Sequence, residues 1–193
     1  MKGFNHRKAV QALNFFARKE GGSINKMKAI KLIWLSDRLH LRRFGRTITG
    51  DTYFALPFGP VASNTRDLLE ASPFCSDEEL AYGGSFIVAK DQYNYSTKAD
   101  TEEKVFSKSD LNAFEEVYHV YGHLNKFELS ELSHLFPEWK KWETALAASQ
   151  SRYLMDLQDF FKDSPSDNPI FQDDPENLDL ALKIFNRSDF KSQ

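Results

Sequence analysis

The stretch that decides the fold spans residues 26–64 and reads KMKAIKLIWLSDRLHLRRFGRTITGDTYFALPFGPVASN. Its first half predicts a long helix, because its apolar residues recur at helical spacing. Asn25 can cap the start of this helix with its side chain, and Gly45 is suited to close it just after Phe44. We therefore expect one helix over about 26–44.

The second half of the stretch links this helix to a strand and to a further helix. Residues 46–52 are rich in turn-forming side chains, and residues 53–55 form a short strand-like run. Residues 57–60 break the chain again, and Pro60 suits the first turn of a helix over about 61–71. The stretch thus predicts a helix, a turn, a short strand and a second helix in close succession.

The helix over 26–44 carries apolar side chains on two faces. One arc of the helical wheel contains Met27, Ile30, Ile33, Trp34, Leu41 and Phe44. A second stripe on nearly the opposite side contains Leu32, Leu35 and Leu39. Basic residues flank this stripe, namely Lys28, Lys31, Arg38, Arg42 and Arg43. Such a helix is either central in its domain or shares one face with a partner, and its basic residues form either a solvated face or a docking patch for an acidic protein or a nucleic acid.

Asp37 falls inside the main apolar arc of this helix. A carboxylate in such a place is costly unless it is paired or hydrogen-bonded. Candidate partners are Arg38, Arg46 and the backbone amides near Gly50. Two interpretations follow. Asp37 is a buried anchor that pins the turn, or it is a catalytic carboxylate that needs a second acid or base group nearby.

The rest of the chain predicts a mainly helical α+β domain with a small antiparallel sheet. Residues 72–84 are expected to form a loop, and 86–89 with 93–95 a hairpin. The run at 53–55 is the natural third strand, because a lone hairpin is marginally stable. Further helices are expected over 5–19, 110–121, 126–135, 138–148, 151–162 and 176–187.

The chain length and composition set the expected organisation. The 193 residues fit one domain, predicted over 1–162, followed over 163–193 by an acidic C-terminal linker and helix. With Cys75 as its single cysteine the chain forms no internal disulfide, which suits the reducing cytoplasm. It contains no run of eighteen apolar residues and no signal-peptide pattern, so we expect a cytoplasmic protein and no contact with membranes.

Sequence patterns for catalysis, metals and DNA are weak. His119 and His123 are four residues apart, but Gly122 lies between them where a helix should end, so no metal site is expected. The helix pair 110–121 and 126–135 resembles a helix-turn-helix in outline, yet its second helix has one lysine against two glutamates, which disfavours DNA. No phosphate-binding or dinucleotide fingerprint is present, so no cofactor is expected.

Several motifs together resemble one known family. They are Lys31-Leu-Ile-Trp-Leu-Ser-Asp37-Arg38, then Gly45-Arg-x-Ile-Thr-Gly50-Asp51-x-Tyr53, then Gly59-Pro60-Val61, and later Tyr121-Gly122, Glu128-Leu-Ser-Glu-Leu-Ser-His134, Pro137-x-Trp139-Lys140 and Leu157-Gln-Asp-Phe-Phe161. In this order and spacing they resemble the Panacea (SocA-like) antitoxin domain of bacterial and phage toxin–antitoxin systems. The likeness covers about residues 5–162. Trp34 stands where a Tyr is usual, and the region 72–106 matches in outline alone.

The resemblance implies a non-enzymatic antitoxin that neutralises a separately encoded protein toxin by binding it. In one SocA-like branch the antitoxin is an adaptor that delivers its toxin to the ClpXP protease, which makes ClpXP a second implied partner. The residues that carry the likeness, here called the signature residues, are interpreted as fold determinants: Lys31, Asp37, Gly45, Gly50, Asp51, Tyr53, Gly59, Pro60, Val61 and His134. Among them, Gly50 and Gly59 suit turns that need positive φ.

The predicted toxin-binding residues lie on the second stripe of the helix over 26–44 and on its basic flank: Leu32, Leu35, Leu39, Arg42 and Arg43. The hairpin region is the other candidate surface. Two alternatives stay open. One is a nucleic-acid-binding transcriptional regulator that uses the basic flank of this helix. The other is an enzyme that uses Asp37, Asp51 or His134, which requires these groups to meet in one cleft.

Overall fold

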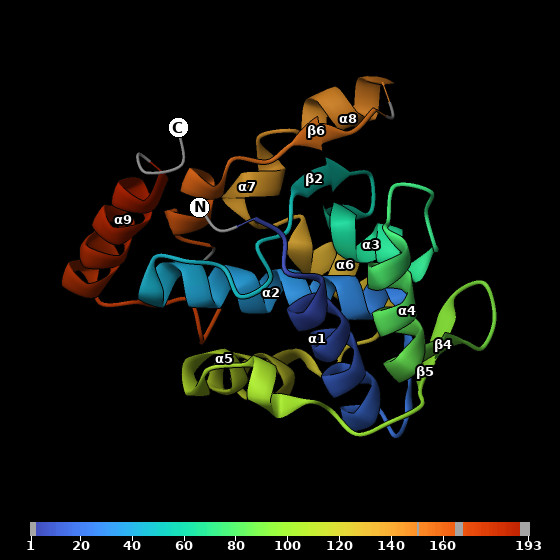
Figure 1. Cartoon of the computed structure of the whole chain (residues 1–193). Coiled ribbons are helices and arrows are strands. Elements are labelled where there is room, and N and C mark those ends of the chain that lie inside the picture. The colour runs from blue at the N-terminus through green and yellow to red at the C-terminus, as the bar shows by residue number, and fades with distance from the viewer. Residues whose placement is uncertain (1–2, 150, 165–167, 190–193) are drawn as a thin grey trace.

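The structure is a computed structural model and describes residues 3–149, 151–164 and 168–189. Within these residues the chain is mainly helical, with two small antiparallel sheets, so the predicted α+β class is confirmed (Figure 1). No helix in the described part of the chain is both long and apolar enough to cross a bilayer. Residues 165–167 of the predicted linker and 190–193 of the predicted tail lie outside the described residues.

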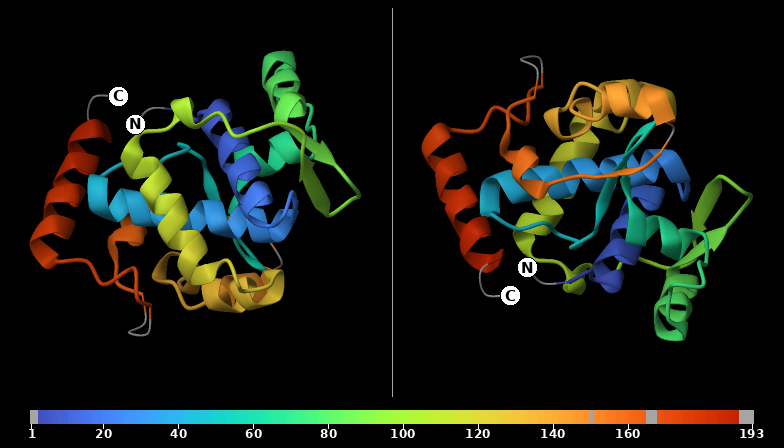
Figure 2. Two further views of the ribbon diagram at one scale, coloured as in Figure 1. Left: turned by 90° about the horizontal axis from the view of Figure 1, so that it is seen from below. Right: turned by 90° about the horizontal axis from the view of Figure 1, so that it is seen from above.

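Helix α2 (Lys26–Phe44) is the centre of the fold. Every side chain from Lys28 to Arg42 is buried, so of the two alternatives for this helix the structure shows the central one. Its caps are those predicted, since the Asn25 side chain accepts a hydrogen bond from the Met27 amide (3.0 Å) and Gly45 has a φ of +66°. The helices packed around it are α1 (His6–Lys19), α3 (Ser63–Leu69), α5 (Lys108–Tyr121), α6 (Lys126–Ser133), α9 (Pro175–Asp189) and the 3-10 helix η2 (Leu157–Phe161) (Figure 2).

The strands form two separate three-stranded sheets. One has the order β1 (Ser23–Asn25), β5 (Asn94–Thr97), β4 (Ile87–Ala89). The other has the order β3 (Gly59–Ala62), β2 (Tyr53–Leu56), β6 (Tyr153–Leu154). The predicted hairpin is present, but its third strand is β1 and not the run at 53–55, which is a correction. β2 instead turns back directly into β3, with Ala55 opposite Pro60.

Pro60 explains why the predicted element at this place is wrong. It was expected in the first turn of a helix, but it lies in β3, a strand at the edge of its sheet. Proline is tolerated in edge strands because its nitrogen can face the open side, where no neighbouring strand needs an N–H donor. The helix expected over 61–71 therefore begins later, as α3.

Three other predicted elements differ from the structure. The region expected as a loop over 72–84 contains most of helix α4 (Asp77–Phe86). A capping box starts this helix: the Ser76 amide donates to the Glu79 carboxylate (2.8 Å), and the Glu79 amide donates to the Ser76 hydroxyl. The helix expected over 138–148 is split into α7 (Pro137–Lys140) and α8 (Glu143–Ser149). The helix expected over 151–162 is replaced by β6 and η2, because residues 153–154 pair with β2.

The C-terminal helix α9 crosses the end of α2 (Figures 1 and 2). Ala181 and Phe185 on α9 and Phe171 before it belong to the same core as α2. Gly45 lies so close to the Ala181 carbonyl and the Ile184 side chain that an added Cβ would collide with both. The division of the chain at residue 162 stays a prediction, which a truncation tests below.

Candidate functional site

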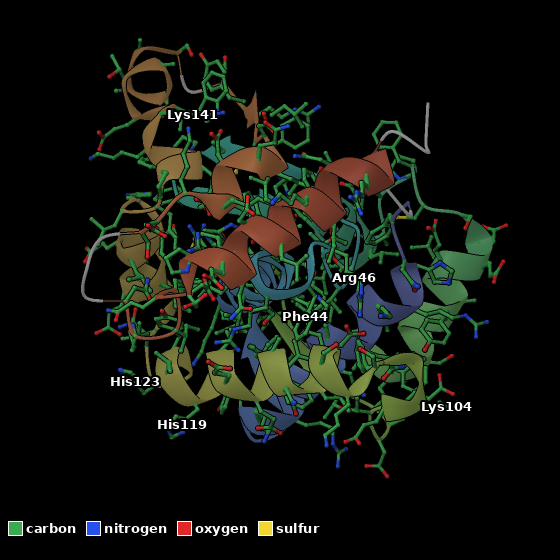
Figure 3. All side chains as sticks on the ribbon, turned by 90° about the vertical axis from the view of Figure 1, so that its left-hand side faces the viewer. Phe44, Arg46, Lys104, His119, His123 and Lys141 are labelled. Carbon is green, nitrogen blue, oxygen red and sulfur yellow. The ribbon has the colours of Figure 1, made fainter. Side chains whose placement is uncertain are left out.

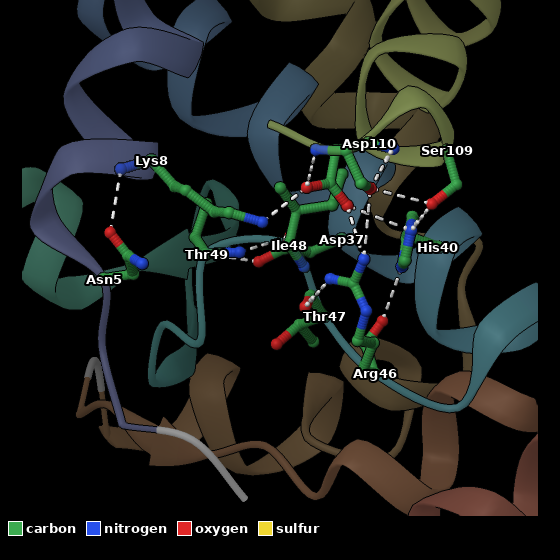
Figure 4. Close-up of polar contacts among 11 residues, drawn as sticks. Asn5, Lys8, Asp37, His40, Arg46, Thr47, Ile48, Thr49, Ser109 and Asp110 are labelled. Carbon is green, nitrogen blue, oxygen red and sulfur yellow. Dashed lines mark hydrogen bonds and ion pairs between the residues drawn. The ribbon is translucent and has the colours of Figure 1, made fainter. Parts of the chain in front are cut away.

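Asp37 holds the link that follows α2. Its carboxylate is fully buried and accepts hydrogen bonds from the amides of Ile48 (2.7 Å) and Thr49 (3.1 Å) and from the Tyr53 hydroxyl (2.7 Å). The Thr49 hydroxyl donates a fourth bond, and Figure 4 shows Asp37 beside Ile48 and Thr49. Burial raises the pKa of Asp37, and these hydrogen bonds oppose the rise. The carboxylate thus fixes the course of the chain from α2 to β2.

The two arginines considered as partners of Asp37 bind elsewhere. Arg38 donates to Glu138 at 2.8 Å, and both side chains are fully buried. Arg46 donates to Asp110 at 2.9 Å. The backbone amides before Gly50 are therefore the partners, and Gly50 has the positive φ (+69°) that its turn was predicted to need.

Asp51 holds the start of α3. Its carboxylate accepts bonds from the amides of Asn64 (2.9 Å) and Thr65 (2.9 Å) and from the Thr65 hydroxyl (2.6 Å). The residue at the N-cap of α3 is Ala62, whose methyl group cannot accept a hydrogen bond, so Asp51 caps the helix from eleven residues earlier in the chain. Burial raises the pKa of Asp51 to about 6, against the effect of these bonds.

The raised pKa of Asp51 predicts a specific pH dependence of stability. A carboxyl whose pKa is about 6 in the folded chain and about 4 in the unfolded chain binds more protons when folded. It therefore stabilises the fold below about pH 4, and this contribution, about 3 kcal/mol, is lost as the pH rises through 6. We expect the free energy of unfolding of the wild type, measured with urea, to fall relative to that of Asp51→Asn between pH 4 and pH 7. A constant difference between the two proteins over this range would contradict the assignment.

Lys31, Gly59 and His134 hold the tip of the β2–β3 hairpin. The Lys31 side chain is buried, and its ammonium donates to the Pro60 carbonyl (2.9 Å). Burial lowers its pKa well below the usual value. The His134 ring stacks on Trp139, with ring centroids 3.8 Å apart, and burial lowers its pKa as well. The Trp139 indole in turn donates to the Leu56 carbonyl (2.8 Å), so α6 and α7 both bind the hairpin.

Gly59 is the point of closest approach in this contact. Its φ is +98°, and a Cβ there would collide with the Ser133 hydroxyl and the Lys31 ammonium. Gly21 has a similar φ (+80°), but no atom lies within 4 Å of a Cβ built there. An alanine at Gly21 therefore measures the cost of backbone strain alone, without a collision. We expect Gly21→Ala to cost about 1 kcal/mol and Gly59→Ala about 3 kcal/mol or more in urea unfolding. Equal losses would show that the close packing at Gly59 does not matter.

A surface groove lies beside this hairpin. It has a volume of about 370 Å³ and lies between the first turns of α2, the β2–β3 hairpin, α3 and the loop before β5. We call it the hairpin groove. Its apolar lining is Met27, Ile30, Leu56, Pro57, Phe58, Pro60, Val61 and Tyr93, and its polar lining is Asn25, Lys26, Lys31, Arg66, Glu70 and Lys126. Three signature residues, Lys31, Pro60 and Val61, line this groove, and of these Val61 is partly exposed while Lys31 and Pro60 are buried.

The chain matches one known protein family. The family model described as antitoxin SocA-like, Panacea domain, matches residues 30–140, more than half of the 193 residues. The chain belongs to this family. No curated protein and no solved structure gives a match. The resemblance seen in the sequence is thereby confirmed, and the Panacea domain contains every signature residue from Lys31 to His134. Its family is one of antitoxins, whose general role is in toxin–antitoxin pairs.

The predicted toxin-binding stripe of the Panacea domain lies in its core, which is a correction. Leu32, Leu35 and Leu39 have no exposed surface, because α2 is covered on both apolar faces. Arg42 is also fully buried and donates to the Phe161 (2.7 Å) and Lys162 (2.9 Å) carbonyls. A partner cannot reach these side chains in the folded chain.

Arg43 is the exposed member of the predicted set, and it is engaged. Its guanidinium makes a two-pronged contact with Glu116 (2.6 and 2.7 Å). The Lys28 ammonium binds Glu20 (2.8 Å) and the Gly122 carbonyl (2.7 Å). The basic residues of α2 thus contact the domain's own carboxylates and carbonyls, so they do not form the open patch that the nucleic-acid alternative requires.

The groups named by the enzyme alternative are used in holding the fold. Asp37 and Asp51 lie near each other, because the Thr49 hydroxyl donates to Asp37 and accepts from the Asp51 amide, but each carboxylate holds its own turn. The His134 ring stacks on Trp139. None of the three lines the hairpin groove. His119 and His123 are exposed at the periphery (Figure 3). Among the described residues, no three His, Cys, Asp or Glu side chains are placed to hold a metal.

A buried ionic network in the Panacea domain was missed by the sequence analysis. Asp110 binds His40 (3.1 Å), Arg46 (2.9 Å) and the ammonium of Lys8, which joins α1, α2 and α5 (Figure 4). Burial by itself would raise the pKa of Asp110, but these partners hold it well below its usual value. One local signal was available, since Ser107 and Asp110 form a capping box that starts α5 two residues before the predicted helix.

Proposed function

We propose that this Panacea domain protein is an antitoxin that neutralises a cognate protein toxin by binding it directly, in the cytoplasm. The observation that carries the proposal is the family match over residues 30–140. The geometry supports a binding role, because the signature carboxylates are used in holding turns while the hairpin groove stays open to a partner. A pocket lined by aromatic side chains is a common site of protein recognition.

Direct binding can silence a toxin in two ways. The antitoxin covers the active surface of the toxin, or it carries the toxin to the ClpXP protease. We favour the first. Covering the toxin requires one binding surface on the antitoxin, which the hairpin groove can provide, whereas delivery requires a second surface for the protease. The half-life of the toxin in cells with and without ClpXP distinguishes the two. Occlusion predicts the same half-life in both, whereas delivery predicts a longer half-life without the protease.

Co-expression with the product of the neighbouring gene tests the proposal. We expect that product alone to stop growth, and growth to return when this chain is produced with it. The negative control is Asp37→Ala. This variant is expected to unfold and therefore not to restore growth. A harmless neighbouring product, or a toxic one that this chain does not counteract, would overturn the proposed function.

A further inference from the structure

We infer that the hairpin groove binds a segment of the toxin in which an apolar side chain is flanked by carboxylates. This inference rests on the proposed function and adds to it the place of binding and the chemistry of the bound segment. It is carried by two independent properties of the groove, its exposed aromatic side chains and its unbalanced positive charge.

Part of the apolar lining of the groove is open to solvent. Phe58 at the hairpin turn is 63% exposed, and Tyr93 in the loop before β5 is 55% exposed. Phe127, the neighbour of Lys126 on α6, is 59% exposed. Large aromatic side chains gain most when a partner covers them, because they bury much area and lose little conformational entropy. A partner segment seated in the groove would therefore gain from covering Phe58 and Tyr93, which both line it.

The charged rim of the groove favours a negative partner. Its cations are Lys26, Arg66 and Lys126, and its one carboxylate is Glu70. Glu70 is already shared by Lys26 (2.7 Å) and Arg66 (3.1 Å). Lys126 has no carboxylate partner among the described residues, and its ammonium lies 4.9 Å from the Phe127 ring centroid. The rim therefore has an excess of positive charge, which carboxylates of a bound segment would balance.

A protein segment fits this groove better than a nucleic acid. Nucleic-acid affinity comes from many phosphate contacts made by rows of Lys and Arg. Of the lysines and arginines that line the groove, Lys26 and Arg66 share Glu70, and the buried Lys31 donates to the Pro60 carbonyl. This leaves Lys126 as the one cation of the rim without a carboxylate partner among the described residues. Its shape and charge suit a short stretch of chain that inserts one apolar side chain and places acidic residues at the rim.

Two substitutions in the groove, each with a control outside it, test the inference. The probe is the purified, catalytically inactivated product of the neighbouring toxin gene, titrated against the full chain. We expect Lys126→Glu and Phe58→Ser each to weaken binding about tenfold or more. The matched controls are Lys104→Glu, whose side chain is 80% exposed, and Phe74→Ser, which is 89% exposed. They should leave the dissociation constant within about twofold.

The charge part of the inference has its own readout. Wild-type affinity should fall as salt rises, and Lys126→Glu should reduce this dependence, whereas Phe58→Ser should retain it. Thermal midpoints of all variants should match the wild type, because each altered side chain is at the surface. Should Lys126→Glu lower the midpoint, Lys126→Gln carries the same test with a smaller charge change.

The possible outcomes separate the inference from the proposed function. If the wild type does not bind the toxin, the proposed function fails and the inference fails with it. If the wild type binds and both groove variants bind equally well, the inference alone is overturned. Binding of a labelled DNA duplex that is lost in Lys126→Glu would also overturn it, in favour of a nucleic-acid partner.

Discussion

The variant Asp37→Ala is expected to be largely unfolded at room temperature. The substitution removes the acceptor for four donors, the amides of Ile48 and Thr49 and the hydroxyls of Thr49 and Tyr53. These groups are buried with it, and each unpaired donor costs about 1–3 kcal/mol. Their sum approaches the whole stability of an ordinary domain, about 5–15 kcal/mol. Circular dichroism and urea unfolding of the purified variant measure the loss.

Two comparisons make this result specific to the hydrogen bonds. Asp37→Asn retains one carbonyl acceptor in nearly the same volume and should lose less stability than Asp37→Ala. Glu78→Ala removes a carboxylate from the exposed first turn of α4 and should cost less than about 0.5 kcal/mol. An Asp37→Ala protein that unfolds at the wild-type urea concentration would show that Asp37 does not hold the turn.

Removing residues 163–193 is expected to unfold the rest of the chain. The deletion strips Phe171, Ala181 and Phe185 from the core. It also removes Asp173, whose carboxylate binds the buried Arg42 at 2.5 Å. A buried charge that loses its partner costs about 3–5 kcal/mol, and each lost large apolar side chain adds about 1.5–3 kcal/mol. Expression of residues 1–162 should give insoluble or unfolded protein.

A pair of point substitutions on α9 supports the truncation. Phe185→Ala, on the buried face, should lose about 3 kcal/mol or more, whereas Leu180→Ala, on the exposed face, should have little effect. A folded fragment 1–162 with a cooperative unfolding transition would instead establish the sequence-based division of the chain into a domain and an appendage.

Local signals explain what the sequence predicted well. The caps of α2, Asn25 and Gly45, act within a few residues of the helix they bound. Gly50 and Gly59 both have the positive φ expected of them, because turn geometry depends on the chain next to the glycine. Features of this kind need no knowledge of the distant chain.

Distant partners explain what the sequence analysis did not predict. The Leu32, Leu35 and Leu39 stripe has the pattern of a binding face, yet it is buried. The elements packed around α2 include α5, α6, η2 and α9, which come much later in the chain. Arg42 was expected on the surface, yet its carbonyl partners lie about 120 residues away. A basic residue beside an apolar stripe gives no sign of such partners.

The hairpin groove illustrates the same point for the candidate site. Its walls come from Met27, Phe58, Tyr93 and Lys126, which belong to four separated segments. The signature motif contained Pro60 and Val61 and thus pointed to this region, but as fold determinants. That they also line a groove follows from the packing of the hairpin against α2 and α6, which the sequence does not reveal.

Calorimetric titration of this chain with the inactivated product of the neighbouring toxin gene is the most direct test of the central claim, that the protein acts by binding a toxin. The account predicts a saturable complex with a defined stoichiometry, formed without nucleotide, metal or nucleic acid. Absence of any complex between the two folded proteins, under conditions in which the same toxin stops cell growth, would contradict it.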